Sequence, residues 1–194
     1  MDECLARKGR LFVIAGPSGV GKGTLRAKAL SDLENLTYSI SCTTRQPRDG
    51  ERDGVDYHFI TVQDFNDRVE SGLFLEHAVV HGHHYGTLLA NVKLETDVGR
   101  HVLLEIDVQG ARQVREILPD SVLIFIAPPS LEVLEKRLRQ RKTESEDKTA
   151  LRMENAKKEL MFSSEFDHVI VNDDLEQACK ELRDLFLSCS ESTE

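Results

Sequence analysis

The sequence predicts an α/β fold built on a parallel sheet, and three observations support this prediction. Short apolar runs, of the kind that form strands buried on both faces of a sheet, recur along the chain. Segments with helical spacing of apolar residues alternate with them, which is typical of a parallel sheet with right-handed crossovers. The 194 residues give room for one compact core with small excursions but are too few for two full domains.

The core elements are expected in alternating order. Four apolar runs predict buried strands, at residues 11–15, 102–106, 122–127 and 169–171. The predicted helices cover residues 24–33, 108–118 and 131–141, and a last helix starts at 173–176 and buries Leu175, Ala178, Leu182 and Leu185. Pro119 ends the second helix, because proline cannot continue one. Ser130 and the Asp173-Asp174 pair are suited to cap the helices that follow them.

Two segments interrupt this alternation. Between residues 39 and 86, short alternating strands at 38–42, 57–61 and 74–80 are separated by a turn rich in Pro, Gly and Arg. This pattern predicts a small, partly antiparallel lobe. Residues 137–160 are highly charged and helical in pattern, with few apolar anchors. Such a segment packs weakly on a core and is suited to move as a lid.

Composition and charge narrow the class of protein. The net charge is −9, from 25 basic and 34 acidic residues, which argues against a general nucleic-acid or membrane surface. The four cysteines lie far apart with no C-x-x-C pair, as expected for reduced thiols in the cytoplasm. A signal peptide or an apolar run near 18 residues is not found, so neither secretion nor membrane insertion is expected.

A phosphate-binding loop is the strongest local prediction. The apolar run at residues 11–15 leads into Gly16-Pro17-Ser18-Gly19-Val20-Gly21-Lys22-Gly23-Thr24 and then into a helix. Glycines let backbone N–H groups converge on an anion, the helix N-terminus adds positive partial charge, and Lys22 reaches the β/γ-phosphates. An ordinary glycine-rich turn is the alternative, which the intact spacing in this strand–turn–helix context disfavours. Gly23 stands where a magnesium-binding hydroxyl is usual, and Thr24 carries the hydroxyl one position later.

The predicted lobe carries polar side chains suited to a second anion. Arg45 and Arg48 flank a proline turn, and arginine forms forked contacts with phosphate oxygens. A solvated basic turn is the alternative. Tyr57 and Tyr85 add phenol groups to the same region. Glu76 lies within an apolar strand, where strand alternation alone would turn it toward solvent.

Three histidines, at positions 81, 83 and 84, are close enough in sequence to suggest a metal site. Their spacing fits no zinc pattern, and no cysteine or carboxylate set accompanies them. We therefore expect exposed loop histidines.

Taken together, these segments resemble the guanylate kinase family over residues 10–187. The motifs that carry the resemblance are Gly-Pro-Ser-Gly-x-Gly-Lys at the loop, 41–51 (Ser-Cys-Thr-Thr-Arg-Gln-Pro-Arg-Asp-Gly-Glu), Gly54-x-x-Tyr57-x-Phe59, Tyr85-Gly86-Thr87, 104–110 (Leu-Glu-Ile-Asp-Val-Gln-Gly), 126–130 (Ile-Ala-Pro-Pro-Ser) and 169–173 (Val-Ile-Val-Asn-Asp). Each motif is short, but their combination in this order is highly specific. The resemblance implies transfer of a phosphoryl group from ATP to GMP, and also to dGMP, with Mg²⁺ as cofactor. This reaction belongs to purine nucleotide metabolism and GMP recycling.

The resemblance also implies an organisation. It comprises a five-stranded parallel P-loop sheet flanked by helices, a small mixed GMP-binding lobe and a helical lid. Core segments would be 1–38, 93–130 and 161–194, the lobe 39–92 and the lid 131–160, all within one catalytic domain. The enzyme is expected to be cytoplasmic, a monomer or homodimer, and to act on small molecules without nucleic acid or membrane partners.

Residue roles follow from the family by position. The matches to the GMP phosphate grip are Arg45, Arg48, Tyr57 and Tyr85, and those to the guanine contacts are Ser41, Glu76 and Thr87. A carboxylate at position 76 can accept both N1–H and the 2-amino group of guanine, whereas adenine lacks that donor pair. This role replaces the solvent-facing interpretation of Glu76.

The remaining roles concern ATP and the metal. Asp107 resembles an acidic residue near the magnesium, with capping of the next helix as a compatible alternative, and Glu105 matches a position near the nucleotide. Thr24 and Asp107 would hold Mg²⁺ mainly through water. The arginines of the lid that would close on the phosphates are Arg137, Arg141 and Arg152, although charged helix residues are ordinarily only solvated. Asn172 matches a contact to the donor adenine, or else caps the last helix.

Two rival functions remain at this stage. A non-catalytic binding module related to these kinases would typically have a degraded phosphate loop, whereas this loop is nearly complete. A kinase for another nucleoside monophosphate is disfavoured by Glu76 together with Ser41 and Thr87.

Overall fold

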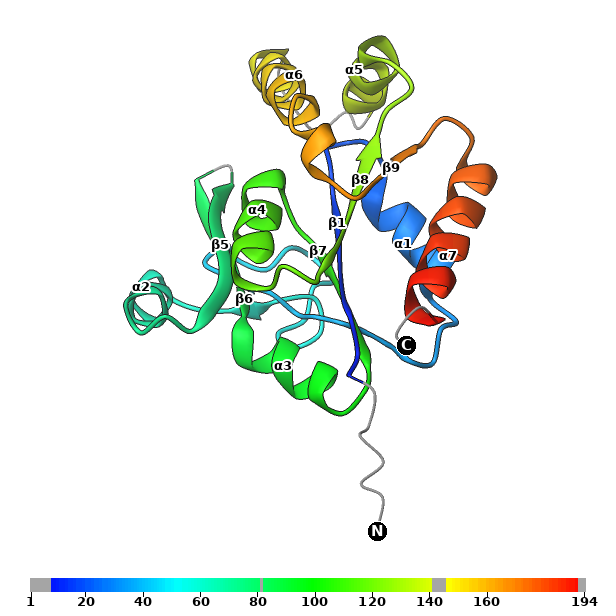
Figure 1. The fold of residues 1–194 in the computed structure, drawn as a ribbon. Helices are drawn as coiled ribbons and strands as arrows, with labels where there is room; N and C mark the ends of the chain where they lie inside the picture. Colours follow the sequence, from blue (N-terminus) through cyan, green and yellow to red (C-terminus); the bar gives the residue numbers. More distant parts are fainter. Residues whose placement is uncertain (1–7, 81, 141–145, 192–194) are drawn as a thin grey trace. The chain divides into compact units, whose positions relative to one another are not determined.

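The computed structural model describes residues 8–80, 82–140 and 146–191. It divides into two compact units, which are treated separately below. The lobe unit comprises Met1–Leu11, Thr37–Leu104 and Gln109–Ser121, and the P-loop unit comprises Phe12–Leu36, Glu105–Val108 and Val122–Glu194. Figure 1 shows the elements of both units.

A five-stranded sheet forms the core, as predicted. Its strand order is β2 (Leu36–Tyr38), β7 (His101–Glu105), β1 (Leu11–Ala15), β8 (Val122–Ala127) and β9 (His168–Val171). Strand β8 pairs in parallel with both β1 and β9. The central strand β1 is buried because all of its residues are apolar, with Phe12 to Ala15 fully inaccessible to solvent. The four strands predicted from apolar runs are confirmed to within one residue at each end.

The prediction for residues 38–42 is wrong, because this stretch does not form one strand of the lobe. Residues up to Tyr38 form β2 of the five-stranded sheet, and only Cys42 and Thr43 form a strand, β3, of the second sheet. Between them the backbone N–H of Ser39 donates to the carbonyl of Leu103, 3.1 Å away. The chain therefore leaves one sheet and enters the other within four residues.

A mixed four-stranded sheet lies in the lobe unit, in the order β4 (His58–Phe59), β3 (Cys42–Thr43), β6 (His83–Leu88) and β5 (Phe74–Val80). The pairs β3–β6 and β6–β5 are antiparallel and β3–β4 is parallel, so the predicted mixed lobe is confirmed. Phe65 stacks on Phe74 with ring centroids 4.6 Å apart, and Cys42 completes this small core.

Two helices of the lobe unit were not predicted. Helix α2 (Val62–Glu70) is capped by Thr61, whose side chain accepts the Asp64 N–H at 3.0 Å, but it buries only Phe65. Helix α3 (Leu89–Asp97) likewise buries only Val92. Val62, Phe65 and Val69 of α2 do have helical spacing, so its signal was present and missed, whereas α3 shows no amphipathic pattern. Helix α4 (Val108–Ile117) has the predicted position.

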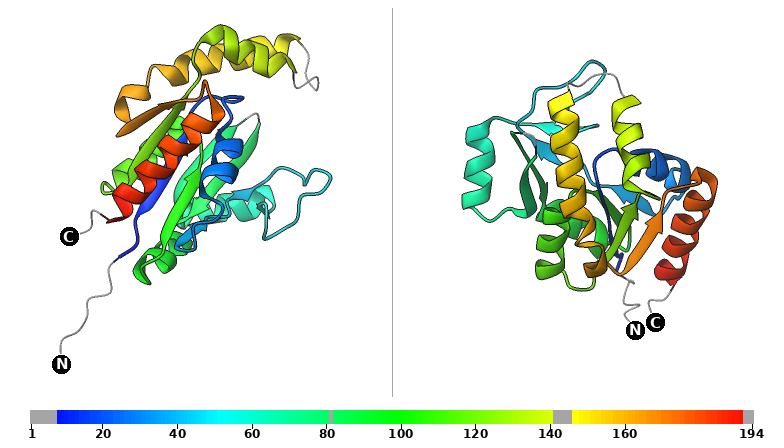
Figure 2. Two further views of the ribbon diagram at one scale, coloured as in Figure 1. Left: turned by 90° about the vertical axis from the view of Figure 1, so that its right-hand side faces the viewer. Right: turned by 90° about the horizontal axis from the view of Figure 1, so that it is seen from above.

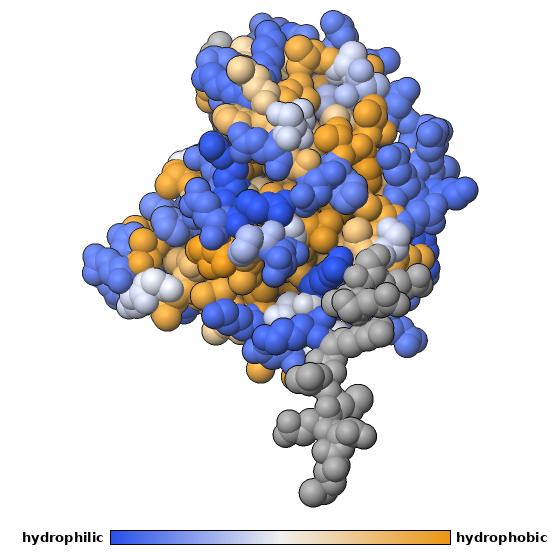
Figure 3. Space-filling view, viewed as in Figure 1, coloured by the Kyte–Doolittle hydropathy of each residue, from blue (hydrophilic) through white to orange (hydrophobic). Residues whose placement is uncertain are grey.

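In the P-loop unit, helices α1 (Lys22–Leu30) and α7 (Leu175–Glu191) pack side by side (Figures 1 and 2). Arg183 on α7 donates to both carboxylate oxygens of Asp32, at 2.6 and 3.0 Å. The rings of Phe12 and Phe186 lie 4.4 Å apart beneath α7. Hydrophilic side chains predominate along the outer side of this helix (Figure 3). Its inner side therefore completes the core and its outer side meets solvent.

The charged segment forms two helices, α5 (Leu131–Gln140) and α6 (Glu146–Leu160), which run next to each other (Figure 2). The predicted caps are confirmed: Ser130 Oγ accepts the Val133 N–H at 3.3 Å, and Asp174 accepts the Gln177 N–H at 2.8 Å at the start of α7. Within the described residues, the helices are all too short or too polar to cross a membrane.

Candidate active site

The phosphate loop follows β1 directly and requires its glycines. Gly16, Gly19 and Gly21 have φ values of +142°, +88° and +100°, a region that side chains disfavour. A Cβ at Gly16 would also lie 2.3 Å from the Ile126 carbonyl oxygen. The ammonium group of Lys22 folds back over the loop and donates to the carbonyl oxygens of Gly16 and Pro17, at 2.5 and 3.3 Å. The ammonium group of Lys22 thus links the end of the loop to its beginning.

Gly23 differs from the other loop glycines because nothing in its surroundings requires a glycine. A Cβ there would be in ordinary contact, 3.6 and 3.7 Å from the carboxylate oxygens of Glu105. Thr24, the next residue, is exposed on the first turn of α1. The hydroxyl at position 24 therefore faces solvent, and a hydroxyl at position 23 would fit sterically.

Acidic groups surround the loop lysine. Burial raises the pKa of Glu159 on α6 to about 7, the charge of Lys22 opposes this shift, and the charge of Asp107 adds to it. Asp107 follows β7 and is partly buried. Oxygen donors of this kind suit Mg²⁺, which keeps several waters and needs few carboxylates. Within the described residues, no group of three or more His, Cys, Asp or Glu side chains forms a closed metal cage.

Glu105, predicted to lie near the nucleotide, pairs with a residue that the sequence did not indicate. Arg26 Nε on α1 donates to Glu105 Oε2 at 3.3 Å. This partner could not be inferred from the sequence, because Arg26 and Glu105 are 79 positions apart in the chain.

Asn172 is buried, with 5% of its surface exposed, at the end of β9. Its backbone N–H donates to the Ala127 carbonyl at 2.8 Å. Its side-chain Nδ2 donates to the carbonyl oxygen of loop residue Val20 at 2.7 Å. The carbonyl of Asn172 accepts from Arg137 Nη1 on α5 at 3.0 Å. Asn172 therefore contacts the phosphate loop and one of the predicted lid arginines together.

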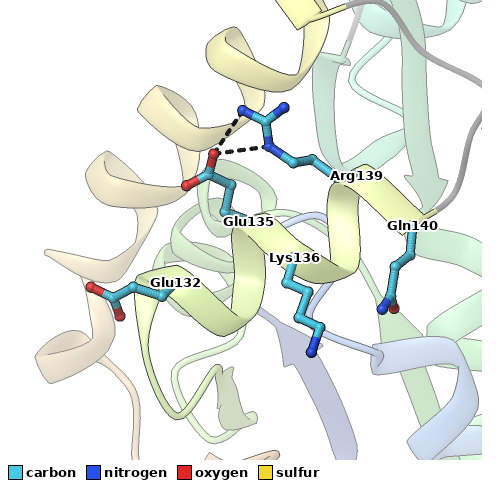
Figure 4. A pocket seen from close by; sticks show the side chains of 5 residues that line it. All are labelled: Glu132, Glu135, Lys136, Arg139 and Gln140. Atoms are coloured by element: carbon cyan, nitrogen blue, oxygen red, sulfur yellow. Dashed lines mark hydrogen bonds and ion pairs between the residues drawn. The ribbon is translucent and has the colours of Figure 1, made fainter.

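The other two predicted lid arginines are Arg152 and Arg141. Arg152 is half-buried on α6, and Arg141 lies outside the described residues. A shallow hollow beside α5 is lined by charged and amide side chains of that helix alone (Figure 4). Arg139 and Glu135 are paired there, with nitrogen–oxygen distances of 3.0 and 2.9 Å. The hollow includes none of the predicted site residues.

In the lobe unit, Glu76 is buried, with 3% of its surface exposed, so the solvent-facing alternative is wrong. Thr87 Oγ1 donates to Glu76 Oε1 at 2.6 Å, and Ser41 Oγ lies 3.5 Å from Thr87 Oγ1. The three residues predicted to read guanine are therefore adjacent. From Glu76 onward β5 alternates, with His77 and Val79 exposed, and Glu76 lies on the less exposed face with Ala78 and Val80.

The predicted phosphate grip is also assembled. Arg45 Nε donates to Tyr85 Oη at 3.2 Å, and its guanidinium lies 5.4 Å from the centre of the Tyr57 ring. Glu51 accepts from both terminal nitrogens of Arg45 and from the backbone N–H of Arg48. Arg45 lowers the pKa of the Glu51 carboxyl, and Glu51 raises that of Arg45. The Arg48 side chain is exposed.

Sequence reasoning missed Glu51 as a site residue. The available signal was a carboxylate three positions after Arg48, close in sequence to both arginines of the turn. The histidines were also misplaced: His83 and His84 begin strand β6 instead of lying in a loop, and the ring of His84 lies 5.1 Å from that of Phe65. His81 lies outside the described residues.

Comparisons with known proteins agree with this arrangement. The family model described as "Guanylate kinase" matches residues 8–188. The guanylate kinase of Thermotoga maritima is 51% identical over 171 residues, covering 88% of this chain and 83% of that protein. That of Corynebacterium glutamicum is 48% identical over 181 residues, covering 92% and 95%. The crystal structure of guanylate kinase from Anaplasma phagocytophilum superimposes with a TM-score of 0.78 at 33% identity, covering 97% of this chain and 90% of that one.

Proposed function

Because the chain belongs to the guanylate kinase family and is an enzyme that phosphorylates GMP to GDP with ATP, we propose that the two groups of residues described above bind its two substrates. The phosphate loop would bind ATP and the lobe unit would bind GMP. The observation that carries the acceptor assignment is the burial of Glu76 against the Thr87 hydroxyl.

Selectivity for guanine follows from this carboxylate. Thr87 occupies one oxygen of Glu76, and the remaining acceptor positions of the carboxylate would meet the N1–H and 2-amino donors of guanine. Adenine offers no such donor pair, so its binding would not supply the hydrogen bonds that guanine gives this buried carboxylate, a mismatch worth about 10⁴–10⁵ in discrimination. Ser41 extends the same polar row. Deoxyguanosine monophosphate presents the same base and would be a second acceptor.

The phosphate of GMP would bind at Arg45, with Arg48, Tyr57 and Tyr85. Arg45 is positioned for this by Glu51 and Tyr85, so little side-chain entropy is lost when an anion arrives. Glu105 and Asp107 are also proposed as contacts to GMP.

The donor phosphates would be bound by the loop from Gly16 to Thr24, with Asn172 beside it. Lys22 would leave the loop carbonyls for the phosphate oxygens, which are stronger acceptors because they are charged. Arg137, Arg141 and Arg152 would add positive charge as the lid closes over the donor. Alignment of the two phosphates and neutralisation of developing charge are sufficient for transfer, because the attacking phosphate is already anionic.

Magnesium would be held mainly by phosphates and water, near Thr24 and Asp107. Bound there, it would neutralise charge on the β- and γ-phosphates. The oxygen donors beside Lys22 fit a hard cation of this kind.

The proposed organisation is one catalytic domain with core segments, a GMP lobe at 39–92 and a lid at 131–160. The net charge of −9 and the small-molecule substrates support a cytoplasmic monomer or homodimer that binds neither nucleic acid nor membrane. Its product GDP would serve purine nucleotide metabolism.

The direct test measures ADP release with Mg-ATP and each of GMP, dGMP, AMP, CMP and UMP in parallel. We expect release with GMP and dGMP and at most trace release with the others. Equal turnover of AMP would overturn the assignment of the guanine contacts. Omitting Mg²⁺ in the presence of a chelator should abolish turnover, and activity that persists would contradict the metal assignment.

A further inference from the structure

The side chain of Asn172 is directed at the phosphate loop, and this placement has a mechanical effect. Its Nδ2 donates to the Val20 carbonyl oxygen at 2.7 Å, from a side chain that is 5% exposed. A peptide unit is planar and trans, so its C=O and N–H point in opposite directions. A Val20 carbonyl held toward Asn172 therefore directs the Gly21 N–H away from Asn172. The backbone N–H groups of such loops are the groups that bind phosphate.

The Asn172 side chain packs so closely against the loop that position 21 has room only for glycine. A Cβ on Gly21 would lie 2.7 Å from the same Nδ2 atom, and φ at this residue is +100°. A side chain at position 21 would displace the amide of Asn172 even if the backbone could adopt the conformation. Val20 itself is fully buried, which holds the peptide from its other end.

Asn172 is held in turn by its own backbone. Its N–H donates to the Ala127 carbonyl at 2.8 Å, continuing the pairing of β9 with β8. Its carbonyl accepts from Arg137 Nη1 at 3.0 Å. One residue thus connects the rigid sheet, the phosphate loop and an arginine of helix α5.

We propose that Asn172 is a positioning residue that fixes the Val20–Gly21 peptide for the triphosphate of ATP, and so acts on the donor through the loop. The inference rests on the proposed role of the loop as the donor site. The contact uses one of the two N–H groups of the side-chain amide, so a group that took this N–H would have to break a buried hydrogen bond.

The test separates the two halves of ATP by using tripolyphosphate and adenosine as probes. In Asn172→Ala we expect tripolyphosphate to bind about tenfold more weakly, the effect of a lost buried hydrogen bond, while adenosine affinity stays within twofold. The KM for GMP should not change, whereas kcat/KM for ATP should fall by about 10²-fold, as expected when reacting groups are displaced. Asn91→Ala, at an exposed asparagine of α3, is the matched control.

The opposite pattern would overturn the proposal. Weaker adenosine binding with unchanged tripolyphosphate binding would make Asn172 an adenine contact, and unchanged binding of both probes would also refute a positioning role. Asn172→Asp keeps the shape but places a carboxylate beside the Val20 carbonyl, so its loss of tripolyphosphate binding should exceed that of Asn172→Ala.

A measurement on the wild-type protein covers the case in which both variants fail to fold. The side-chain NH₂ signals of Asn172 should be protected from solvent exchange in the free enzyme and remain so with tripolyphosphate bound. Rapid exchange in the free enzyme, or a large shift with adenosine alone, would refute the proposal. Absence of GMP-dependent ADP formation in the wild type would instead count against the proposed function.

Discussion

Glu51 holds Arg45 through both terminal nitrogens, each 2.9 Å from a different carboxylate oxygen. The same carboxylate accepts the backbone N–H of Arg48 at 2.8 Å. Only 10% of the Arg45 side chain and 19% of the Glu51 side chain are exposed, so the pair is well shielded from solvent. A two-point contact of this kind fixes the plane of a guanidinium group as well as its position. The turn is therefore organised around one carboxylate before any phosphate arrives.

Glu51→Gln should weaken GMP binding without affecting ATP. The amide cannot accept from both nitrogens of Arg45, so the guanidinium becomes mobile and must be ordered when GMP binds. We expect the KM for GMP to rise about tenfold, since one charge-assisted hydrogen bond is lost. The KM for ATP should stay within twofold. Steady-state kinetics with each substrate varied in turn measures both values.

The matched control is Asp49→Asn, which removes an exposed carboxylate from the same turn and should leave both constants unchanged. Equal increases of the two KM values in Glu51→Gln would contradict the assignment, because they would indicate a general loss of structure.

Glu76→Gln should reduce the preference for GMP over AMP more than it slows turnover. Thr87 can still donate to the amide oxygen, so the fold of the lobe is retained. The NH₂ group of glutamine, however, meets the donor groups of guanine, and discrimination should fall by about 10²-fold or more. Competition assays with the two monophosphates measure the ratio, with Glu70→Gln on the exposed side of α2 as the control. An unchanged ratio would refute the guanine assignment of Glu76.

Gly23→Ser should be tolerated and should lower the Mg²⁺ concentration needed for half-maximal activity. The structure leaves space for the side chain, and the new hydroxyl would supply the ligand that position 23 lacks. Gly23→Ala is the control: it should raise the free energy of unfolding by about 0.5–1 kcal/mol, since glycine weakens a helix, without a change in Mg²⁺ requirement. Gly21→Ala should instead abolish ATP binding. A higher Mg²⁺ requirement in Gly23→Ser would contradict this expectation.

His101 should make stability depend on pH. Its burial, with the nearby charge of Arg10, lowers its pKa below 6.5, and its Nδ1 accepts the Arg10 N–H at 2.9 Å. The unfolded chain therefore binds the proton more tightly, so this stabilisation is complete above about pH 6.5 and is lost as the pH falls toward the folded pKa. His101→Asn keeps an acceptor in place of Nδ1 but cannot titrate.

Urea unfolding at pH 5 and pH 8 checks this prediction. The wild type should lose more stability at pH 5 than His101→Asn does. Equal losses in the two proteins would show that other groups cause the dependence.

The core was predictable because its signal is local. Strands such as β1 and β8 are continuous apolar runs, and their ends coincide with those expected. The lobe was less predictable, because β3 and β4 have two residues each and exist only through pairing with distant strands. Helix α2 was missed although Val62, Phe65 and Val69 have helical spacing, because the segment is short and its other residues are polar.

The sequence proposed the members of the candidate site but could not indicate how they pair. The role of Glu76 came from the family resemblance, whereas alternation alone turned it toward solvent; in the structure it shares the less exposed face of β5 with Ala78 and Val80. Arg26 and Glu51 were not identified, since their partners Glu105 and Arg45 are determined by packing and not by spacing. The contact of Asn172 with Val20 joins residues 152 positions apart and leaves no local trace.

The side chain of Gln113 on α4 pairs with the backbone of the strand that bears Glu76. Its side-chain amide accepts the His77 N–H at 3.0 Å and donates to the His77 carbonyl at 2.9 Å, as a neighbouring strand would. Strand β5 lies at the edge of the four-stranded sheet, where free backbone groups invite pairing with another molecule. Gln113 occupies this edge at one residue, and its two hydrogen bonds favour the observed register of β5. A slip by one position would turn Glu76 outward. The amide of Gln113 thus occupies one residue of this edge and would help to keep Glu76, the proposed guanine contact, on its buried face.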